Sequence, residues 1–293
     1  MHWHKITLVG VGLLGGSLGL AIKRHHLAGR VEGFVRREAS VVECEKLGVV
    51  DRAHLELAPA VADADLVVFC TPIARMAPLA RQMLPALRPG VLVTDVGSVK
   101  GSVVRELEPL FAQAGACFIG SHPLAGAEKM GPAHAKGDLF AHAVCVVTPT
   151  PHSKPELVEQ LEELWRRVGG IPLRLTPEVH DDLVSRSSHL PHVVAAELAN
   201  YVLSPAHPKA QAMLCATGFR DTTRIASGSP EMWRDICLAN SKNLARVLGV
   251  FIEDLQEFRL ALEQGDVKAI EDFFELAKKR REAWQAQGAA TAE

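Results

Sequence analysis

Three glycines near the start of the chain have the spacing of a dinucleotide-binding loop. Gly10, Gly12 and Gly15 fit the pattern G-x-G-x-x-G, between an apolar run and an apolar helical pattern. The first glycine of this pattern allows a tight turn, the second lets the backbone approach a pyrophosphate, and the third lets the helix pack closely on the strand. The helix N-terminus then faces the phosphates. We therefore expect the loop to bind a dinucleotide through Gly10, Gly12, Leu13, Leu14 and Gly15.

Two arginines follow the next predicted strand. In a site that prefers NAD, an acidic residue usually ends this strand and bonds the ribose 2′-hydroxyl. Here that position is apolar, and Arg36 and Arg37 follow it. Guanidinium groups make charge-assisted, bidentate contacts to phosphate, so this pair favours NADP over NAD as the cofactor. The alternative is two surface arginines at the start of a loop. We also expect Thr71 and Pro72, directly after the strand predicted at 66–70, to bind the cofactor.

A serine and a histidine come after two further predicted strands. Ser98 lies in the polar segment 94–100, and His122 lies in the polar segment 120–128. Open α/β sheets bind ligands at the carboxyl ends of their strands. Imidazole titrates near neutral pH, which makes His122 a candidate acid–base group beside a nicotinamide. The alternative is a structural role, because the chain contains 13 histidines.

Two arginines in the C-terminal part are spaced to meet an anion. Arg220 and Arg224 stand four residues apart, which is one turn of a helix. Cations placed in this way could clamp an anionic substrate. Ion pairs at the protein surface are the alternative.

Three histidines of the C-terminal part raise the question of a zinc site. His180, His189 and His192 are accompanied by no H-E-x-x-H motif and by no cluster of cysteine and histidine. Pro191 starts or kinks a helix here, which gives the segment a structural explanation. We predict no metal site.

The elements that must position these residues follow an alternating pattern in the first half of the chain. Continuous apolar runs predict buried parallel strands at 6–9, 31–35, 66–70 and 91–95. Helical patterns lie between them at 16–26, 39–47 and 76–87. Runs at 118–120, 144–148 and 173–175 are expected to be later strands of the same sheet. This order predicts an α/β Rossmann-type domain with a parallel sheet, covering residues 1–176.

The pattern changes at Pro177. Strand signals disappear after it, and long amphipathic segments follow at 191–203, 230–264 and 267–285. We therefore expect an all-α domain over residues 177–293. Within it, we expect Trp233, Asp235 and Asn240 to serve in packing.

The composition limits the class of protein. The chain has 293 residues, 48% hydrophobic and 23% charged, which is ordinary for a globular protein with two domains. Its formal net charge is −2, so we expect no general affinity for nucleic acid or anionic membranes. Six cysteines without a C-x-x-C motif suggest reduced thiols. With no predicted signal peptide and no apolar run of ~20 residues, we expect a cytoplasmic protein.

Five motifs of the chain occur in the order found in one enzyme family. The motifs are GVGLLGGSLG at 10–19, DVGSVK at 95–100, GSHPLAGAEKMG at 120–131, SSHLPH at 187–192 and GFRDTTRIASGSPEMWRDI at 218–236. From about residue 5 to about residue 280, the chain resembles the prephenate and arogenate dehydrogenases of tyrosine biosynthesis. The resemblance implies oxidative decarboxylation of prephenate to 4-hydroxyphenylpyruvate, with hydride transfer to NAD or NADP. Conversion of arogenate to tyrosine is the alternative.

The resemblance also implies roles for particular residues. His122 matches the histidine that hydrogen-bonds the ring hydroxyl and assists its deprotonation, and Ser98 matches the serine that orients this histidine. Arg224 matches an arginine that binds a substrate carboxylate. Ser188 and His192 match a pair that faces the substrate.

Two further features come from the same resemblance. Glu128 matches an acid at the mouth of the pocket, although Ala127 stands where many relatives have a polar residue. Family members dimerise through interlocked helical domains, so the resemblance implies a homodimer through residues 177–293. The only other partner we expect is the small-molecule substrate.

Two other functions are compatible with the dinucleotide-binding loop. A β-hydroxyacid-type dehydrogenase would use a catalytic lysine in the second domain, but Lys209, Lys242 and Lys268 lack a matching motif. A nucleotide-sensing protein without catalysis would bind the cofactor and turn nothing over. The candidate residues argue against it, because a protein without catalysis has no need to keep all of Ser98, His122, Ser188, His192 and Arg224.

Overall fold

A computed structural model describes residues 2–127 and 129–290. Two compact units make up the chain, Met1–Ser241 and Lys242–Glu293. The boundary predicted at 176–177 marks the place where strands give way to helices, and as a domain boundary it stays a prediction.

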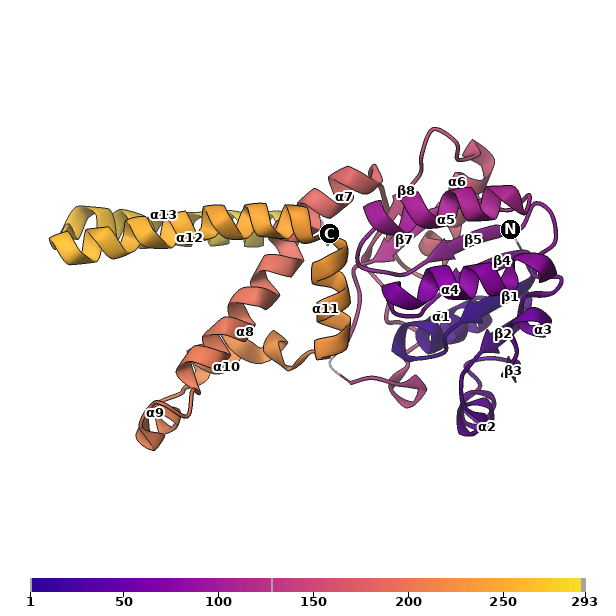
Figure 1. The fold of residues 1–293 in the computed structure, drawn as a ribbon, viewed down its shortest axis with the longest axis horizontal. Helices are drawn as coiled ribbons and strands as arrows, with labels where there is room; N and C mark the ends of the chain where they lie inside the picture. The colour runs from indigo at the N-terminus through magenta and orange to yellow at the C-terminus, as the bar shows by residue number, and fades with distance from the viewer. Residues whose placement is uncertain (1, 128, 291–293) are drawn as a thin grey trace. The chain divides into compact units, whose positions relative to one another are not determined.

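The first unit contains a six-stranded parallel sheet (Figure 1). Its strand order is β3-β2-β1-β4-β5-β6, which reverses direction between β1 and β4. This reversal creates the crevice in which doubly wound sheets bind ligands. The strands are β1 (Trp3–Val9), β2 (Ala28–Phe34), β3 (Arg52–His54), β4 (Leu66–Phe69), β5 (Leu92–Asp95) and β6 (Cys117–Phe118).

Helices connect these strands and cover the sheet with two apolar clusters. One cluster contains Leu8 and Leu18, and the other contains Phe69 and Phe111. The four long apolar runs of the sequence form buried parallel strands as predicted. The connecting helices are α1 (Leu13–Arg24), α2 (Glu38–Lys46), α3 (Leu57–Val61), α4 (Ile73–Met83) and α5 (Gly101–Gln113), and α6 (Pro155–Arg167) follows later in the chain, after β6.

A second sheet of three strands corrects one expectation. The strands β7 (Gly120–Pro123), β8 (Val144–Thr148) and β9 (Ile171–Arg174) form a separate sheet. The prediction that the runs at 144–148 and 173–175 extend the first sheet was therefore wrong, whereas the run at 118–120 begins in β6, which belongs to that sheet. β7 is antiparallel to β8, and β8 is parallel to β9. A short apolar run predicts a strand but gives no information about its partner strand, which is why the sequence pattern failed here.

From β9 to residue 290 the regular elements are all helical, as predicted. Thr176 caps α7 (Pro177–Val184) by accepting the Val179 N–H, and Pro177 occupies the first turn. The segment predicted at 230–264 is interrupted at Asn240, where α11 ends. The remaining elements of this part are the π-helical turn η3 (Ser185–His189), α8 (Leu190–Val202), α9 (Lys209–Met213), α10 (Thr217–Thr223), the 3-10 turn η4 (Arg224–Ser227) and α11 (Pro230–Ala239).

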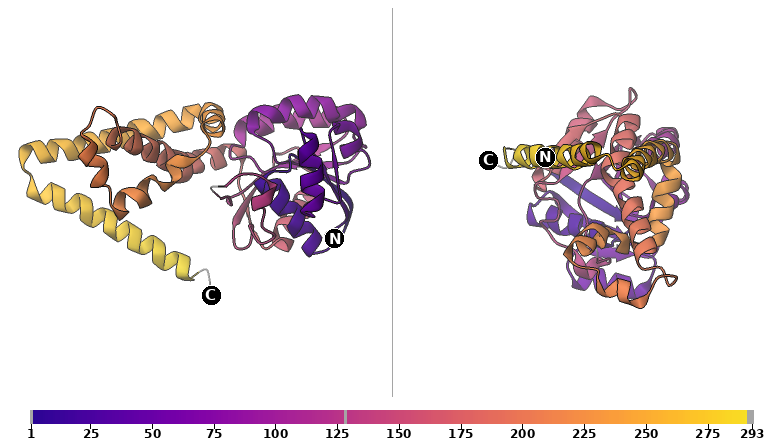
Figure 2. Two further views of the ribbon diagram at one scale, coloured as in Figure 1. Left: turned by 90° about the horizontal axis from the view of Figure 1, so that it is seen from below. Right: turned by 90° about the vertical axis from the view of Figure 1, so that its left-hand side faces the viewer.

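Two long helices make up the second unit (Figure 2). α12 (Ser241–Gln264) and α13 (Val267–Ala290) are joined by a turn at Gly265, whose φ of +67° suits glycine. Phe258 and Phe273 pack across the turn, with 4.4 Å between ring centroids. Large apolar side chains on both helices are exposed, among them Ile252, Leu255, Leu262, Phe274 and Trp284.

Candidate active site

The glycine loop joins β1 to α1 and fits a dinucleotide pyrophosphate. Gly10 has a φ of +97°, and a Cβ atom there would lie 2.7 Å from Thr71 Cγ2. A Cβ atom on Gly15 would lie 2.2 Å from the Gly10 carbonyl oxygen, so helix and strand need glycine at both positions. A Cβ atom on Gly12 would meet nothing within 4 Å, so open space lies in front of this backbone. The first turn of α1 carries no acidic residue, which suits an anionic ligand.

The residues predicted beside the loop come from neighbouring strand ends. Thr71 and Pro72 follow β4, and the buried Thr71 hydroxyl makes no hydrogen bond within residues 2–127 and 129–290. Arg36 and Arg37 follow β2 and are exposed, and Arg37 precedes α2 as its N-cap. These groups surround the carboxyl ends of β1, β2 and β4, where the sequence placed the cofactor.

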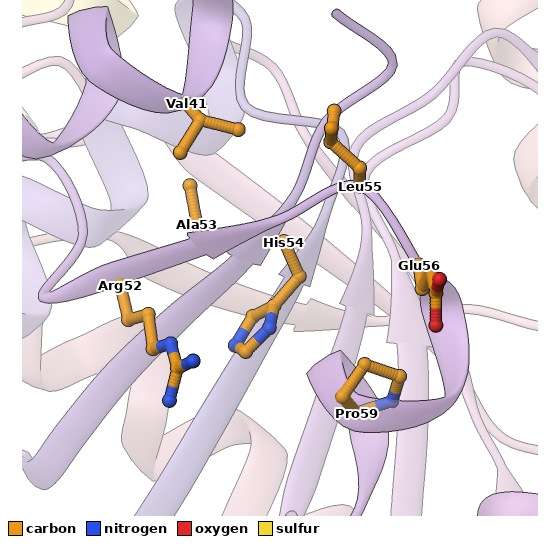
Figure 3. Close-up of a pocket in the computed structure, with 7 residues that line it drawn as sticks. All are labelled: Val41, Arg52, Ala53, His54, Leu55, Glu56 and Pro59. Atoms are coloured by element: carbon orange, nitrogen blue, oxygen red, sulfur yellow. The ribbon is translucent and has the colours of Figure 1, made fainter. Parts of the chain in front are cut away.

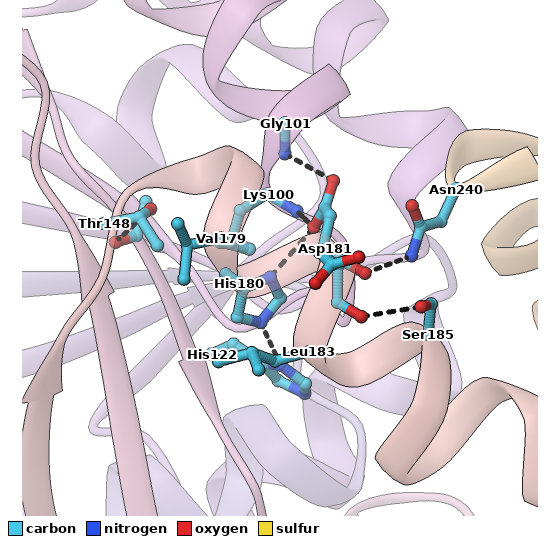
Figure 4. Close-up of polar contacts among 12 residues, drawn as sticks. Lys100, Gly101, His122, Thr148, Val179, His180, Asp181, Leu183, Ser185 and Asn240 are labelled. Carbon is cyan, nitrogen blue, oxygen red and sulfur yellow. Dashed lines mark hydrogen bonds and ion pairs between the residues drawn. The ribbon is translucent and has the colours of Figure 1, made fainter. Parts of the chain in front are cut away.

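His122 lies on β7 and is almost fully buried. Its Nδ1 atom lies 2.9 Å from Nε2 of His180, which is on α7. The Nδ1 atom of His180 lies 2.8 Å from Oδ1 of Asp181. Figure 4 shows these three side chains in a row, with Asp181 at the end away from His122.

Asp181 connects α7 to the start of α5. Its carboxylate accepts the backbone N–H groups of Lys100, at 2.7 Å, and Gly101, at 2.8 Å. A carboxylate at this position is also favourable because a helix N-terminus carries partial positive charge.

Lys100 is fully buried beside these residues. Its ammonium group forms an ion pair with Asp95, which is also fully buried, and donates to the Ser121 carbonyl oxygen at 2.8 Å. A buried ion pair of this kind needs hydrogen-bond partners for its remaining polar atoms, and the Ser121 N–H supplies one to Asp95 at 3.2 Å. The carboxyl end of β5 is therefore joined to β7 by a buried, charged cluster.

A π-helical turn places the next group of predicted residues. η3 interrupts the helix between α7 and α8, and such turns occur frequently at functional sites. His192 Nδ1 lies 2.9 Å from the Ser188 carbonyl oxygen. The His192 ring lies against Trp233, with 3.9 Å between ring centroids.

Asn240 and His189 join this helical cluster to Asp181. Asn240 donates to the Asp181 carbonyl oxygen at 2.8 Å, and its Nδ2 atom lies 3.2 Å from His189 Nδ1. Trp233 contacts the edge of the His189 ring. Trp233 and Asn240 thus pack within the helical part, and they do so against candidate site residues.

The remaining residues predicted for the site make fewer contacts with one another. Ser98 lies between β5 and α5, and its backbone is among the groups that act on His189; its contact with His122 stays a prediction. Arg224 begins η4 close enough to His192 for its charge to lower the pKa of that histidine. Glu128 lies outside the described residues. Arg220 is exposed on α10.

The site keeps its histidines neutral. Burial, with smaller contributions from His180, Lys100 and His189, holds the pKa of His122 well below its ordinary value. Burial also lowers the pKa of His180, against the opposing effect of the Asp181 hydrogen bond. Burial lowers the pKa of His189 to about 4. A neutral imidazole has one unprotonated nitrogen, so each of these side chains has one nitrogen that can accept a hydrogen bond.

Two observations limit other interpretations. Among the described residues, no three His, Cys, Asp or Glu side chains gather so that they could hold a metal ion. No helix among the described residues is both long and apolar enough to cross a membrane.

A surface pocket of about 300 Å³ lies at β3 and α3 and contains none of the predicted site residues. It is lined by Val41, Arg52, Ala53, His54, Leu55, Glu56 and Pro59 (Figure 3).

The sequence did not assign roles to three members of the buried cluster. Asp181 and Lys100 were not singled out as site residues, and His180 was considered only as a zinc ligand. Position along the chain gives no sign that His180 lies beside His122, because 58 residues separate them. Lys100 stands in the motif DVGSVK, and its place after a buried strand was the one available signal.

Models of one family match both parts of the chain. Residues 18–172 match "Prephenate dehydrogenase, nucleotide-binding domain", and residues 176–279 match "Prephenate dehydrogenase, dimerization domain". The chain belongs to the prephenate dehydrogenase family. This confirms the resemblance found in the sequence motifs.

Similar proteins cover nearly the whole chain. A prephenate dehydrogenase of Bacillus subtilis (strain 168) is 35% identical over 280 residues, which cover 94% of this chain and 75% of that protein. A cyclohexadienyl dehydrogenase of Zymomonas mobilis is 33% identical, with 94% of each chain covered.

Solved structures of the family share the fold. The prephenate dehydrogenase of Aquifex aeolicus, in complex with hydroxyphenyl propionate and NAD+, has a TM-score of 0.87 at 30% identity, and the match covers 96% of this chain and 98% of that one. An arogenate dehydrogenase of Synechocystis has a TM-score of 0.81 at 28% identity, with 96% and 99% covered. The protein is thus an NAD(P)-dependent oxidoreductase of this family, with a Rossmann-type nucleotide-binding domain and a helical region after it.

Proposed function

We propose that the protein oxidatively decarboxylates prephenate to 4-hydroxyphenylpyruvate, with His122 as the catalytic base. The observation that carries this proposal is the buried, neutral His122, whose Nδ1 is engaged by His180, so that Nε2 is the nitrogen available to a substrate. Prephenate has a ring hydroxyl at C4, and a base is needed where that hydroxyl becomes acidic during oxidation.

The chemistry can be written bond by bond. The nicotinamide of a bound NAD(P)+ supplies an acceptor for the hydride that leaves C4. Positive charge develops on C4 and its hydroxyl as this bond breaks, and His122 stabilises it by accepting the hydroxyl proton through Nε2. The bond between ring C1 and its carboxylate then breaks. Its electron pair completes the aromatic ring, and CO₂ leaves.

We propose that Arg224 binds a carboxylate of this dianionic substrate, with Ser188 and His192 beside it. Arg224 lies near His192, whose ring is held by Trp233 and whose pKa is lowered, so a neutral donor or acceptor stands next to a cation. Ser98 and Glu128 complete the proposed substrate contacts. With a net charge of −2, the chain needs such a local cation to attract an anion.

The residues after β2 favour NADP over NAD as the cofactor. Arg36 and Arg37 are exposed where the ribose 2′ position is expected. The acid of this strand, Glu32, is buried and lies 2.8 Å from Lys5 and 2.9 Å from His54, so it is engaged elsewhere. Cytoplasmic location and a homodimer through the helical region complete the proposal, the latter because residues 176–279 match a dimerization domain.

Initial rates over two substrates and two cofactors test this proposal. Purified protein is mixed with prephenate or arogenate and with NAD+ or NADP+, and reduced nicotinamide is followed by absorbance. We expect the highest kcat/KM with prephenate and NADP+. The proposed activity would be refuted if the protein reduced neither cofactor with either substrate. A higher kcat/KM with arogenate would show that arogenate, and not prephenate, is the preferred substrate.

Substitution of the arginine pair tests the cofactor separately. Replacing both Arg36 and Arg37 by alanine is expected to raise KM for NADP+ by about tenfold or more, because a charge-assisted hydrogen bond contributes ~1.5–3 kcal/mol. KM for NAD+ should change little. Arg30→Ala, on an exposed arginine at the other end of β2, is the matched control. Equal changes for both cofactors would contradict the NADP preference.

A further inference from the structure

Three buried side chains form a hydrogen-bond series that ends at the proposed base. We propose that His180 and Asp181 are positioning residues, which together fix the tautomer of His122 so that its Nε2 atom is the unprotonated one. This inference rests on the proposed function only in taking His122 as the base. Its geometry is independent of the substrate, because it is given by the 2.9 Å contact between the two rings and the 2.8 Å contact to the carboxylate.

The direction of each hydrogen bond follows from the chemistry of the carboxylate. An ionised carboxylate only accepts, so the proton of His180 must lie on Nδ1, which faces Asp181. In a neutral imidazole the other nitrogen is then an acceptor, so Nε2 of His180 carries a lone pair. Nδ1 of His122 must donate to it. The Nε2 atom of His122 is left without a proton, as a general base requires.

Asp181 is held firmly enough to set this direction. Both of its carboxylate oxygens accept backbone N–H groups at the start of α5, and its own carbonyl oxygen accepts from Asn240 (Figure 4). The two bonds from α5 hold the carboxylate beside His180 Nδ1, where it acts as a hydrogen-bond acceptor.

The charges around the pair act on it in opposite directions. The fully buried Lys100 is paired with Asp95, and its charge still lowers the pKa of His122. The charge of Asp181 remains, 2.8 Å from His180. When His122 accepts the substrate proton, its positive charge is stabilised by this carboxylate through the His180 ring. Lys100 and His189 are the other charged or titratable groups that act on His122, and Asp95 and Lys100 act on His180.

Two variants of His180 separate a positioning role from a structural one. His180→Leu removes the acceptor for His122 Nδ1, and His180→Gln restores an oxygen acceptor at a similar distance along the side chain. His54→Leu is the matched control, since it removes another largely buried histidine bonded to a carboxylate, Glu32, away from the site. Circular dichroism and thermal unfolding establish that each variant is folded.

Nitrogen-15 NMR of the histidine-labelled protein reads the tautomer directly. The resonances of His122 are assigned by their loss in His122→Asn. We expect a proton on Nδ1 and none on Nε2 in the unsubstituted protein, and a shift of the proton to Nε2 in His180→Leu. A proton on Nε2 of His122 in the unsubstituted protein would overturn the inference. This readout needs no substrate, so it stands even if prephenate is not turned over.

Kinetics supply the second readout. His180→Leu should lower kcat by about 10²- to 10³-fold with KM changed less than about threefold, since general base catalysis contributes ~10²- to 10⁴-fold. His180→Gln should recover at least about tenfold of that loss, and His54→Leu should keep normal kcat. A folded His180→Leu variant whose kcat lies within about threefold of normal would refute the positioning role. Absence of turnover in the unsubstituted protein would refute the proposed function instead.

Discussion

At the scale of single residues, burial decides the protonation state of His122. The ordinary pKa of histidine lies near 6.5, and burial moves that of His122 well below it. Lys100, His180 and His189 act in the same direction. In the proposed mechanism the neutral form of His122 is the active one, so activity should persist at pH values where an exposed histidine is already protonated.

This predicts the acid limb of the pH profile. As the pH falls through 6.5, kcat/KM with prephenate should stay constant, and it should decline only at clearly lower pH. The sign follows because a lowered pKa delays protonation of the base. The pKa of His192 is also lowered, so it shifts the limb in the same direction. Initial rates in overlapping buffers measure the profile, and an acid limb at or above pH 6.5 would contradict the prediction.

Two glycines of the loop should respond differently to alanine. Gly15→Ala brings a Cβ atom to 2.2 Å from the Gly10 carbonyl oxygen, so we expect Tm to fall by about 5–10 °C. Gly12→Ala meets no protein atom within 4 Å, so Tm should hold while KM for the cofactor rises, because the methyl group enters the space of the pyrophosphate. Thermal unfolding and cofactor titration measure the pair. Unchanged cofactor affinity in Gly12→Ala would contradict the prediction that the pyrophosphate binds against Gly12.

At the scale of elements, the sequence predicted the strands with strong apolar runs and missed those held by tertiary context. β1, β2, β4 and β5 were evident from their hydrophobic patterns. β3 has only three residues, and two of them are charged or titratable. The pairing of β7 with β8 depends on where the chain turns after β6, and a local hydrophobic pattern does not predict that turn.

Candidate site residues could be predicted from the sequence only where they lie within a recognisable motif. His122, Ser188 and His192 were identified because their motifs match a known family. The contact between His122 and His180 depends on how α7 packs against β7, so sequence spacing could not reveal it. The π-helical turn was also not predicted. It changes the helical register of the chain, and the amino-acid composition of the segment gives no sign of that change.

That turn leads to a prediction for the element. Deletion of Ser187, an exposed residue within η3, would restore regular helical register and rotate α8 by about 100° relative to α7. His192 would then leave the side of the helix that contacts Trp233, and kcat should fall by about 10²-fold or more, in line with lost substrate positioning. Helical content by circular dichroism should be kept.

A length-preserving variant controls for the loss of the side chain. Ser187→Ala removes only the hydroxyl, which donates to the Leu183 carbonyl oxygen at 3.1 Å. It should retain nearly normal activity. Normal kcat in the deletion variant would show that the register of α8 is unimportant for the site.

At the scale of the whole molecule, the second unit exposes many large apolar side chains to solvent. Leu255 is 47% exposed, Leu262 54% and Phe274 60%, and patches of such residues mark interaction sites. Together with the match of residues 176–279 to a dimerization domain, this favours a homodimer. The sequence predicted it from the family resemblance, because amphipathic faces alone do not identify the partner.

Light scattering after size exclusion tests the assembly. We expect a mass of twice 31.7 kDa at micromolar concentration. Leu255→Glu should shift the protein toward the monomer, because it places a charge in an apolar contact. Lys268→Gln, on an exposed residue of α13, should leave the mass unchanged. A monomeric unsubstituted protein would contradict the proposed interface.

The carboxylate of Asp181 has a consequence for how the molecule can move. Through it, α7 is bonded to the first residues of α5, and through Asn240 the end of α11 is bonded to α7. These bonds join α7 to the nucleotide-binding part, even though the strands end before Pro177. Asn240 also contacts His189, so the π-helical turn at 185–189 is tied to the end of α11 as well. Movement of α7 relative to α5 or α11 would have to break at least one of these hydrogen bonds.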